Sequence, residues 1–410
     1  MTVSSQPSST SVPTSDIDPF FPRNLEDPHP MHHELREMGP VVYLSTYDVY
    51  AMARYEEVRA SLENWQQFSS GAGVGLSNFR YEDPWRPPSL LLETDPPKHD
   101  APRAVLSKVL GPRQLHKFRE DWAAEADTLV TSVLAEHGRP GGDVVIDGVS
   151  HLAEVFPLQV FPNAVGLQGS GLDSLLPYGD HAFNAFGPSN DLVAKRADQI
   201  PQLAAWVDEQ CQRDQLQQTG FGAEIWAASD RMDITADQAP LIVRSLLTAG
   251  VDTTVYGIAA VLYHLAANPR EYARLRDRPE LARAAVEEAL RLESPVQTFF
   301  RTALEDVHMA DAVIPDGQKI LMFLGSANRD PRRWPHPDQF DLTRDPSGHV
   351  AFGSGLHQCV GQHIARLEAT CLLQALLPRV SRIELSEEPQ RHLNNTLLGW
   401  EHLPLRLELT

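Results

Sequence analysis

One cysteine lies in a segment whose residue types suit a charged metal ligand. Cys359 ends the run Phe-Gly-Ser-Gly-Leu-His-Gln-Cys over residues 352–359, and Gly361 follows it. The two glycines of the run permit the positive φ values of a tight turn. We expect an amphipathic helix over 359–377, whose first N–H groups and dipole would lower the thiol pKa and hold a thiolate. Gly361 would let a flat ring approach the backbone, so the run predicts a thiolate facing a planar group. A buried, inert cysteine is the alternative.

A second segment with reactive side chains, Ala249 to Thr254, lies inside a long apolar helix predicted over 235–268. Thr235 and Gln238 form a capping box at its start. Glycine, aspartate and threonine are poor helix formers, so we expect the hydrogen-bond ladder to open here and Thr253 to bond a carbonyl or a water. A buried acid and alcohol among apolar neighbours need a purpose, and Asp252 and Thr253 are therefore candidate catalytic residues.

Charged residues recur at helical spacing elsewhere. Glu288 and Arg291 stand at i and i+3, where they can pair, although such pairs are common on surfaces. His99 and Arg103 stand at i and i+4. Pro102 between them could shift the start of that helix.

These residues must be positioned by a mainly helical chain. Helical periodicity is seen near 99–110, 112–137, 150–166, 171–186, 190–218, 221–229, 235–268 and 270–292. Strand-like runs lie at 41–44, 49–53, 307–314 and 319–324, and 69–92 reads as a long loop. We see no internal repeat and no composition shift that marks a domain boundary.

Composition excludes several classes. The formal charge of −20 disfavours nucleic acid and anionic membrane surfaces, which need clustered Lys and Arg. Three cysteines without a Cys-x-x-Cys pair predict neither a disulfide framework nor a zinc site, and fit the cytoplasm. The apolar region 241–267 is interrupted by charged and polar residues, so we expect a buried helix and no membrane span. Residues 1–18 have no signal-peptide pattern and are predicted to be a disordered tail.

The cysteine run resembles the haem-binding signature of the cytochrome P-450 family at Phe352, Gly353, Gly355, His357, Cys359 and Gly361. The resemblance covers roughly residues 25–408. It implies a mainly α fold, a triangular helical prism with a small β region, as one domain over 19–410. It also implies haem b, with Cys359 ligating the iron, and dioxygen as co-substrate.

The same resemblance assigns roles to the other segments. Ala249, Phe352, Gly353 and Gly361 would contact the haem. Its propionates would be held by His99, Arg103, Arg301 and His357. Asp252 and Thr253 would manage protons during oxygen activation. Glu288 and Arg291 would pair with Arg344 in a structural triad.

A narrower resemblance concerns the substrate. Residues 73–79, 85–90, 183–188 and 294–300 resemble a bacterial branch that oxidises para-substituted benzoates, notably by O-demethylating 4-methoxybenzoate. An apolar slot for the ring is predicted from Leu92, Phe183, Phe186, Ala249, Val296 and Phe299. Donors for the carboxylate are predicted at Arg86, Ser89, Arg244 and Ser245.

The resemblance implies electrons from an iron–sulfur ferredoxin that is reduced by an NADH-dependent reductase. Candidate docking residues are Lys98, Arg103, Lys108, Arg113 and Lys117, which scattered solvated charges would match equally well. Three alternatives stay open: a peroxygenase, a monooxygenase of another small hydrophobic acid or terpenoid, and a non-enzymatic haem-thiolate sensor. Retention of Asp252 and Thr253 argues against the sensor, and the phenylalanines favour an aromatic substrate.

Overall fold

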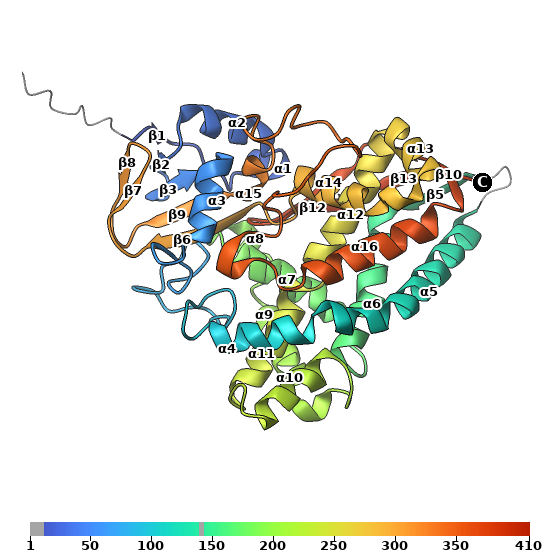
Figure 1. The fold of residues 1–410 in the computed structure, drawn as a ribbon, viewed down its shortest axis with the longest axis horizontal. Coiled ribbons are helices and arrows are strands. Elements are labelled where there is room, and N and C mark those ends of the chain that lie inside the picture. The colour runs from blue at the N-terminus through green and yellow to red at the C-terminus, as the bar shows by residue number, and fades with distance from the viewer. Residues whose placement is uncertain (1–11, 139–142) are drawn as a thin grey trace, which may run out of the picture.

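A computed structural model describes residues 12–138 and 143–410. Its outline is broad at one edge and tapers toward α10. The strands of the larger sheet lie at one side, β5, β10 and β13 lie at the opposite side, and helices make up most of the rest (Figure 1). The α-helices are α1 (Pro22–Glu26), α2 (His29–Met38), α3 (Tyr55–Glu63), α4 (Asp100–Val109), α5 (Pro112–His137), α6 (Val155–Val165), α7 (Leu175–Asn184), α8 (Asp191–Ala194), α9 (Ile200–Gln210), α10 (Phe221–Asp230), α11 (Gln238–Ala249), α12 (Asp252–Ala267), α13 (Pro269–Asp277), α14 (Ala282–Glu293), α15 (Leu324–Ala327) and α16 (Gln362–Leu376).

The strands make one larger sheet and three small ones. In chain order they are β1 (Thr14–Ser15), β2 (Val42–Leu44), β3 (Val49–Met52), β4 (Phe68–Ser69), β5 (Asp143–Asp147), β6 (Thr298–Ala303), β7 (Val307–Met309), β8 (Ala312–Ile314), β9 (Lys319–Phe323), β10 (Val380–Leu385), β11 (Gln390–Leu393), β12 (Leu398–His402) and β13 (Pro404–Leu409). The larger sheet has the order β1-β2-β3-β9-β6-β4, and the smaller ones are β10-β13-β5, β11-β12 and β7-β8.

The predicted disordered tail is wrong for residues 12–18. Thr14–Ser15 form β1, which runs parallel to β2 and adds an edge strand to the larger sheet. The carbonyls of Pro13 and Ser15 accept hydrogen bonds from Tyr43 and Ser45, and Phe20 is buried in the adjoining core. Backbone pairing with an open edge therefore orders a segment whose composition suggested disorder. Residues 1–11 lie outside the described part of the chain, and the single domain stays a prediction.

The long apolar helix opens where its sequence predicts. It consists of α11 and α12, separated at Gly250 and Val251. A Cβ on Gly250 would lie 2.3 Å from the ring of Phe161, so the close approach of α6 requires glycine there. Half of the capping box forms, because the Gln238 side chain accepts a 2.9 Å hydrogen bond from the Thr235 N–H.

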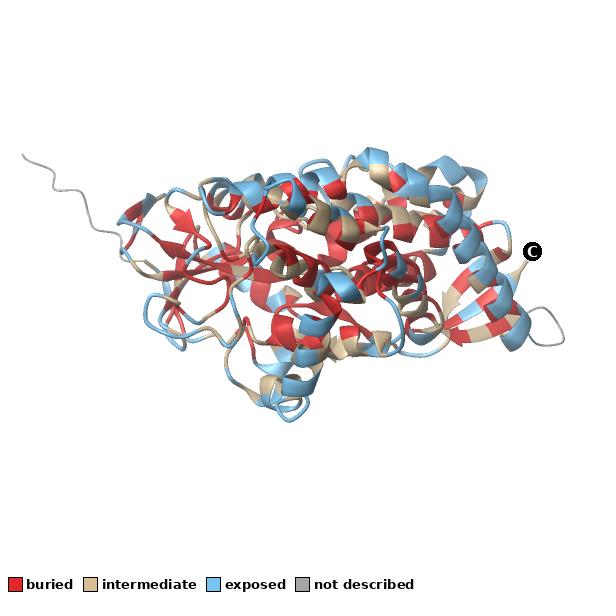
Figure 2. Cartoon of the chain, turned by 90° about the horizontal axis from the view of Figure 1, so that it is seen from below, coloured by how far each residue is buried: buried red, intermediate tan, exposed pale blue. Residues whose placement is uncertain are grey.

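Residues 238–267 together are long and apolar enough to cross a membrane. In their most apolar window, however, 72% is buried inside the protein, as in the core helix of a soluble protein. Figure 2 shows the interior of the protein, with buried residues running through the centre and exposed residues on the outer helices.

Other boundaries differ from the prediction. The helix predicted over 190–218 is broken into α8, α9 and a short 3-10 turn. The segment 150–166 begins with a π-helical turn before α6, and 270–292 is split into α13 and α14. Strand β6 was not predicted, because five of its six residues are buried and no alternation marks one face.

Candidate active site

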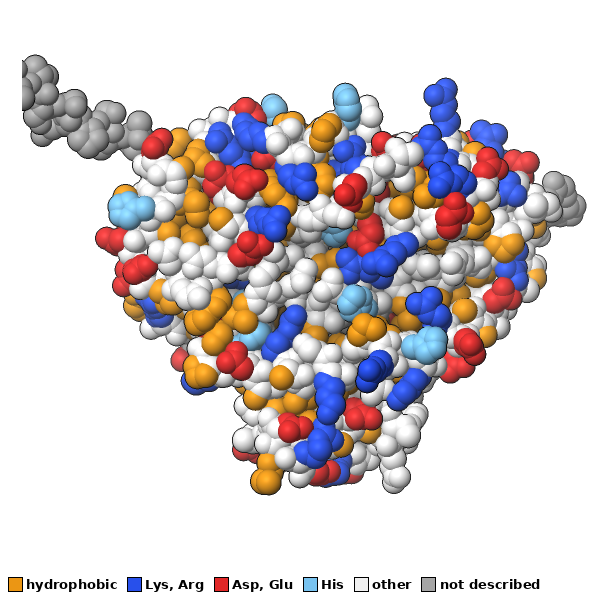
Figure 3. All heavy atoms as spheres, viewed as in Figure 1, with side chains coloured by type: hydrophobic (Ala, Val, Ile, Leu, Met, Phe, Trp, Pro, Cys, Tyr) orange, Lys and Arg blue, Asp and Glu red, His pale blue; other side chains and the backbone are white. Residues whose placement is uncertain are grey.

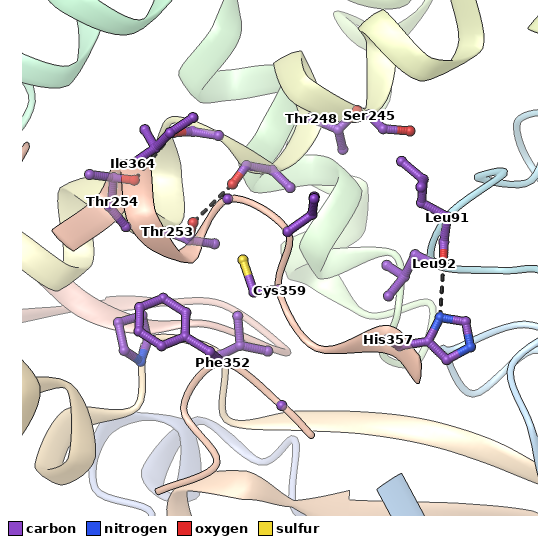
Figure 4. Close-up of a pocket in the computed structure, with 18 of the residues that line it drawn as sticks. Leu91, Leu92, Ser245, Thr248, Thr253, Thr254, Phe352, His357, Cys359 and Ile364 are labelled. Carbon is purple, nitrogen blue, oxygen red and sulfur yellow. Dashed lines mark hydrogen bonds between the residues drawn. The ribbon is translucent and has the colours of Figure 1, made fainter. Parts of the chain in front are cut away.

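A cavity of about 250 Å³ lies between the loop 86–92, α7, α11–α12, β6 and the cysteine run 352–361. The side chain of Cys359 is open to this cavity, and Figure 4 shows its sulfur between the run and the helix that carries Thr253. The Cys359 N–H donates a 2.8 Å hydrogen bond to the Phe352 carbonyl, which closes the run into a hairpin. The predicted positive φ values are confirmed at +68° for both Gly353 and Gly355.

The setting of the thiol differs from the prediction in two ways. Helix α16 begins at Gln362, three residues after Cys359, and a 3-10 turn over Gly355–His357 precedes the cysteine. Burial by the surrounding protein raises the pKa of the Cys359 thiol, and the N–H groups of Gly361 and Gln362 only partly oppose this. The expected lowering of the thiol pKa is therefore wrong for the protein alone. A thiolate here needs a cation in front of the sulfur.

Cationic side chains line the cavity wall beside Cys359. Arg103 from α4, Arg301 from β6 and His357 from the cysteine run all face the cavity. Arg301 is buried and donates to the Phe300 carbonyl at 2.8 Å, and its burial lowers its pKa to about 10. The acid nearest this set is Asp95, whose carboxylate lies 3.6 Å from His357 Nε2. Arg103 and Arg301 together carry one more positive charge than Asp95 offsets, which favours an anionic ligand.

His99 stands behind this wall and does not line the cavity. Its ring contacts that of His357 at 4.9 Å between centroids, edge to face. Neither ring nitrogen has a hydrogen-bond partner within the described residues, and burial lowers the pKa of His99 to about 4. Pro102 does not displace this residue, because it lies in the first turn of α4, where proline is tolerated.

The two candidate catalytic residues point in different directions. Thr253 lines the cavity and donates a 2.9 Å hydrogen bond to the Ala249 carbonyl (Figure 4). Asp252 is buried and lies against α7, where its Oδ2 would be 1.8 Å from a Cβ on Gly179. Burial and then the nearby Asp180 hold the pKa of Asp252 well above its usual range, so this carboxyl keeps its proton.

The apolar slot is assembled as predicted. Leu92, Phe183, Phe186, Ala249, Val296 and Phe299 all line the cavity. Phe186 contacts both Phe183 and Phe299 edge to face, with centroids 5.7 and 6.0 Å apart. Phe299 and Arg301 reach the same space because alternate residues of β6 share one face.

The predicted anion donors also line the cavity, namely Arg86, Ser89, Arg244 and Ser245. Arg244 is buried and donates to the Pro87 carbonyl at 2.7 Å. The hydroxyls of Ser89 and Ser245 lie 3.4 Å apart. Helix α11 and the loop 86–92 therefore bring four donors to one end of the cavity.

Two residues near this polar end were not predicted. Thr248 lines the cavity on α11, one turn from Arg244, whose carbonyl accepts its hydroxyl at 2.8 Å. Glu93 lies behind the wall and pairs with Arg86 at 3.0 Å. A lone acid after the apolar run 90–92, seven residues beyond an arginine, was the available signal for Glu93.

The predicted triad forms outside the cavity. Arg291 Nε lies 2.8 Å from Glu288 Oε2, and Arg344 Nε lies 2.8 Å from Glu288 Oε1. Arg291 is fully buried and also donates to the carbonyls of Asn328 and Pro337. The surface salt bridge considered as the alternative is excluded, because this arginine joins α14 to the segment that precedes the cysteine run.

The predicted basic patch loses one member and keeps the others exposed. Arg103 faces the cavity and is unavailable for docking, whereas Lys98, Lys108, Arg113 and Lys117 are exposed on α4, α5 and the loop before them. On the face that carries α5 and α16, several Lys and Arg side chains run down the middle of the surface (Figure 3). This positive strip contrasts with the formal charge of −20.

Known proteins resemble this chain along most of its length. The family model described as cytochrome P-450 matches residues 194–408. Cytochrome p450 CYP199A2 of Rhodopseudomonas palustris is 54% identical over 97% of this chain and 95% of its own. The beta-dihydromenaquinone-9 omega-hydroxylase of Mycobacterium tuberculosis is 31% identical over 95% of this chain and 78% of its own. The structure of CYP109Q5 from Chondromyces apiculatus covers 96% of this chain and 99% of its own, with a TM-score of 0.79 and 29% identity.

Proposed function

This chain belongs to the cytochrome P-450 family, and we propose that within it the protein oxidises para-substituted benzoates. The reaction we favour is O-demethylation of 4-methoxybenzoate to 4-hydroxybenzoate and formaldehyde. As a monooxygenase of this family the protein uses haem b and dioxygen, takes electrons from redox partners and acts on a hydrophobic substrate.

The residues around Cys359 fit a haem. A Cβ on Gly361 would meet no atom closer than the Cys359 sulfur at 3.9 Å, so there is room for a flat ring above this backbone. We assign Cys359 as the iron ligand and Arg103, Arg301 and His357 as partners of the two propionates, with His99 supporting His357. Ala249, Phe352, Gly353 and Gly361 line the same space. When bound, the haem supplies activation of dioxygen and insertion of one oxygen atom into the substrate.

The observation that carries the substrate class is the buried pair Arg86 and Arg244 at one end of an aromatic slot. Arg244 is buried and forms no ion pair within the described residues, whereas Arg86 is paired with Glu93, so a benzoate carboxylate would supply the anion that Arg244 lacks. Ser245 on α11 and Thr253 on α12 both line the cavity, on either side of the break between these helices. A benzoate held near Ser245 would then lie along the slot with its para group toward Thr253 and Cys359, which gives regioselectivity by position.

The chain's own polar groups would manage protons. Asp252 holds a proton because its carboxyl is buried, and Thr253 presents a hydroxyl to the cavity beside Cys359. We propose that Asp252 supplies protons and that Thr253 places them. Phe183, Phe186 and Phe299 exclude water from the rest of the slot. A passive haem sensor would have no use for this acid and alcohol.

The electron donor we propose is a small iron–sulfur ferredoxin with an NADH-dependent reductase, in the cytoplasm. Its negative surface would meet the exposed Lys98, Lys108, Arg113 and Lys117.

Optical titration of the ferric holoenzyme tests the substrate class. We expect 4-methoxybenzoate to convert the iron from low to high spin with micromolar affinity or better, and Arg244→Ala to abolish that response. A fatty acid or a terpenoid that shifts the spin state, while 4-methoxybenzoate does not, would refute the assignment and favour another hydrophobic substrate.

A further inference from the structure

An acid lies behind the end of the cavity that Arg86 and Arg244 line. Glu93 is 5% exposed, and its Oε2 lies 3.0 Å from Arg86 NH1. The Arg86 side chain is itself only 10% exposed, and its Nε has no partner within the described residues. A carboxylate so deeply buried beside an anion-binding group requires an explanation, because it opposes the binding of an anion.

Glu93 is held in place from two sides. Its Oε2 also accepts a 2.7 Å hydrogen bond from the Ser89 N–H, and its own N–H donates to the Ser89 carbonyl at 3.0 Å. Glu93 thereby closes the turn that carries Ser89, and Arg244 binds the same loop through the Pro87 carbonyl. These bonds hold the carboxylate beside Arg86.

The charge at this end can be counted. Arg86 and Arg244 contribute two positive charges and Glu93 contributes one negative charge, which leaves one net positive charge. Burial, and then the like charge of Arg86 close by, lower the pKa of Arg244. Asp208 also acts on Arg244, but it is exposed and its charge is screened by solvent. Lys319 is near enough to feel Glu93, but burial lowers the pKa of Lys319 to about 7, so its side chain is mostly neutral at pH 8 and is left out of the count.

We propose that Glu93 is a positioning residue that sets the charge of the anion site, so that the site accepts a singly charged carboxylate and rejects a doubly charged head group such as an aryl phosphate. This inference rests on the proposed benzoate function. A monoanion neutralises the remaining positive charge, whereas a dianion leaves a net negative charge buried beside Glu93. Without Glu93 the two arginines would match a dianion.

The discriminating measurement is the ratio of two dissociation constants. The two constants are those for the phosphate dianion and for the benzoate monoanion. When the negative charge of Glu93 is removed, the dianion gains twice as much binding free energy as the monoanion, because it carries twice the charge. We therefore expect Glu93→Gln to tighten binding of the dianion relative to the monoanion by about tenfold or more. Glutamine keeps the shape and can still accept the Ser89 N–H, so a purely structural role would leave this ratio unchanged.

The experiment uses the ferric holoenzyme at pH 8, where a phosphate monoester is a dianion. 4-Methoxybenzoate is titrated by its spin-state change, and 4-methoxyphenyl phosphate is titrated by displacement of the benzoate. Glu93→Asp keeps the charge and should retain the wild-type ratio. Asp83→Asn removes an equal charge from an exposed position three residues before Arg86, and it should also retain that ratio.

The outcomes separate this inference from the proposed function. An unchanged ratio in Glu93→Gln, or an equal shift in Asp83→Asn, would overturn the role of Glu93. If Glu93→Gln does not fold, Glu93→Ala takes its place, and its ratio must move in the same direction because the same negative charge is lost. If 4-methoxybenzoate does not bind the wild-type protein, the proposed function fails before the ratio is reached.

Discussion

The hydroxyl of Thr253 donates a 2.9 Å hydrogen bond to the carbonyl oxygen of Ala249, on the far side of the break between α11 and α12. This bond satisfies a carbonyl that the interrupted ladder leaves free, and it holds the hydroxyl at the cavity surface. Thr253 therefore has both a local structural role and a position suited to proton transfer.

If Thr253 places protons, its removal should uncouple electron use from product formation. We expect Thr253→Ala to turn over NADH at a similar rate but to divert most of the electrons to hydrogen peroxide. Product and peroxide measured per NADH consumed test this. Thr253→Ser keeps the hydroxyl and should restore most of the coupling. Equal coupling in the alanine and wild-type proteins would show that Thr253 is only structural.

The triad of Glu288, Arg291 and Arg344 should dominate stability near the cysteine run. Arg291 is fully buried, and its removal leaves Glu288 as a buried charge with one partner. We expect Arg291→Ala to cost about 3–5 kcal/mol of unfolding free energy. Arg344→Ala should cost less, because its guanidinium also reaches exposed carbonyls and is nearer to solvent. Urea unfolding of both variants measures the two losses of unfolding free energy. A larger loss for Arg344→Ala than for Arg291→Ala would contradict this account.

The cysteine run and the opening of the long helix were predictable because each depends on local sequence. Glycine at 353 and 355 requires no knowledge of distant residues, and poor helix formers mark the break at 250–251. The direction of Asp252 was not predictable, since it depends on the missing side chain of Gly179, 73 residues away. Glu93 was missed for the same reason: a single acid acquires meaning only when folding buries Arg86 and Arg244 beside it.

Glu368 should make stability depend on pH. Both of its carboxylate oxygens are buried on α16 without a partner in the described chain, and burial holds its pKa well above its usual range. The folded protein keeps this proton where the unfolded chain, with an ordinary pKa, releases it. Unfolding therefore releases a proton, and stability falls as the pH rises above about 4.5, by at most about 1.4 kcal/mol per unit.

Glu368→Gln removes that dependence. We expect the Tm of the variant minus the Tm of the wild type, both measured by circular dichroism, to increase steadily from pH 5 to pH 8. Glu401→Gln changes the same group at an exposed position and should show a constant difference. If the Tm difference for Glu368→Gln is also constant, the Glu368 carboxyl of the folded wild-type protein is ionised throughout pH 5 to pH 8.

The exposed basic strip should govern electron transfer. Lys108, Arg113 and Lys117 lie on α4 and α5 with their charges in solvent. Reversal of one such charge, as in Lys117→Glu, should raise the KM for a ferredoxin roughly threefold or more at low salt and leave substrate affinity unchanged. Lys195→Glu, an equal change at an exposed position after α8, should have little effect. Equal KM values for the two variants would place the docking site elsewhere.

Haem binding should require glycine at position 361, whereas the fold itself should tolerate alanine there. A Cβ at this position would meet only the Cys359 sulfur at 3.9 Å, and its φ of −84° suits any residue. Gly361→Ala should therefore leave the Tm of the haem-free protein nearly unchanged, while haem is lost to a scavenging protein roughly tenfold faster. Gly355→Ala should behave in the opposite way, because it has a φ of +68° and its Cβ would lie 2.8 Å from the Glu63 backbone. Strain of this kind costs about 1–3 kcal/mol whether or not haem is present. Normal haem retention in Gly361→Ala would mean that the ring does not approach this backbone.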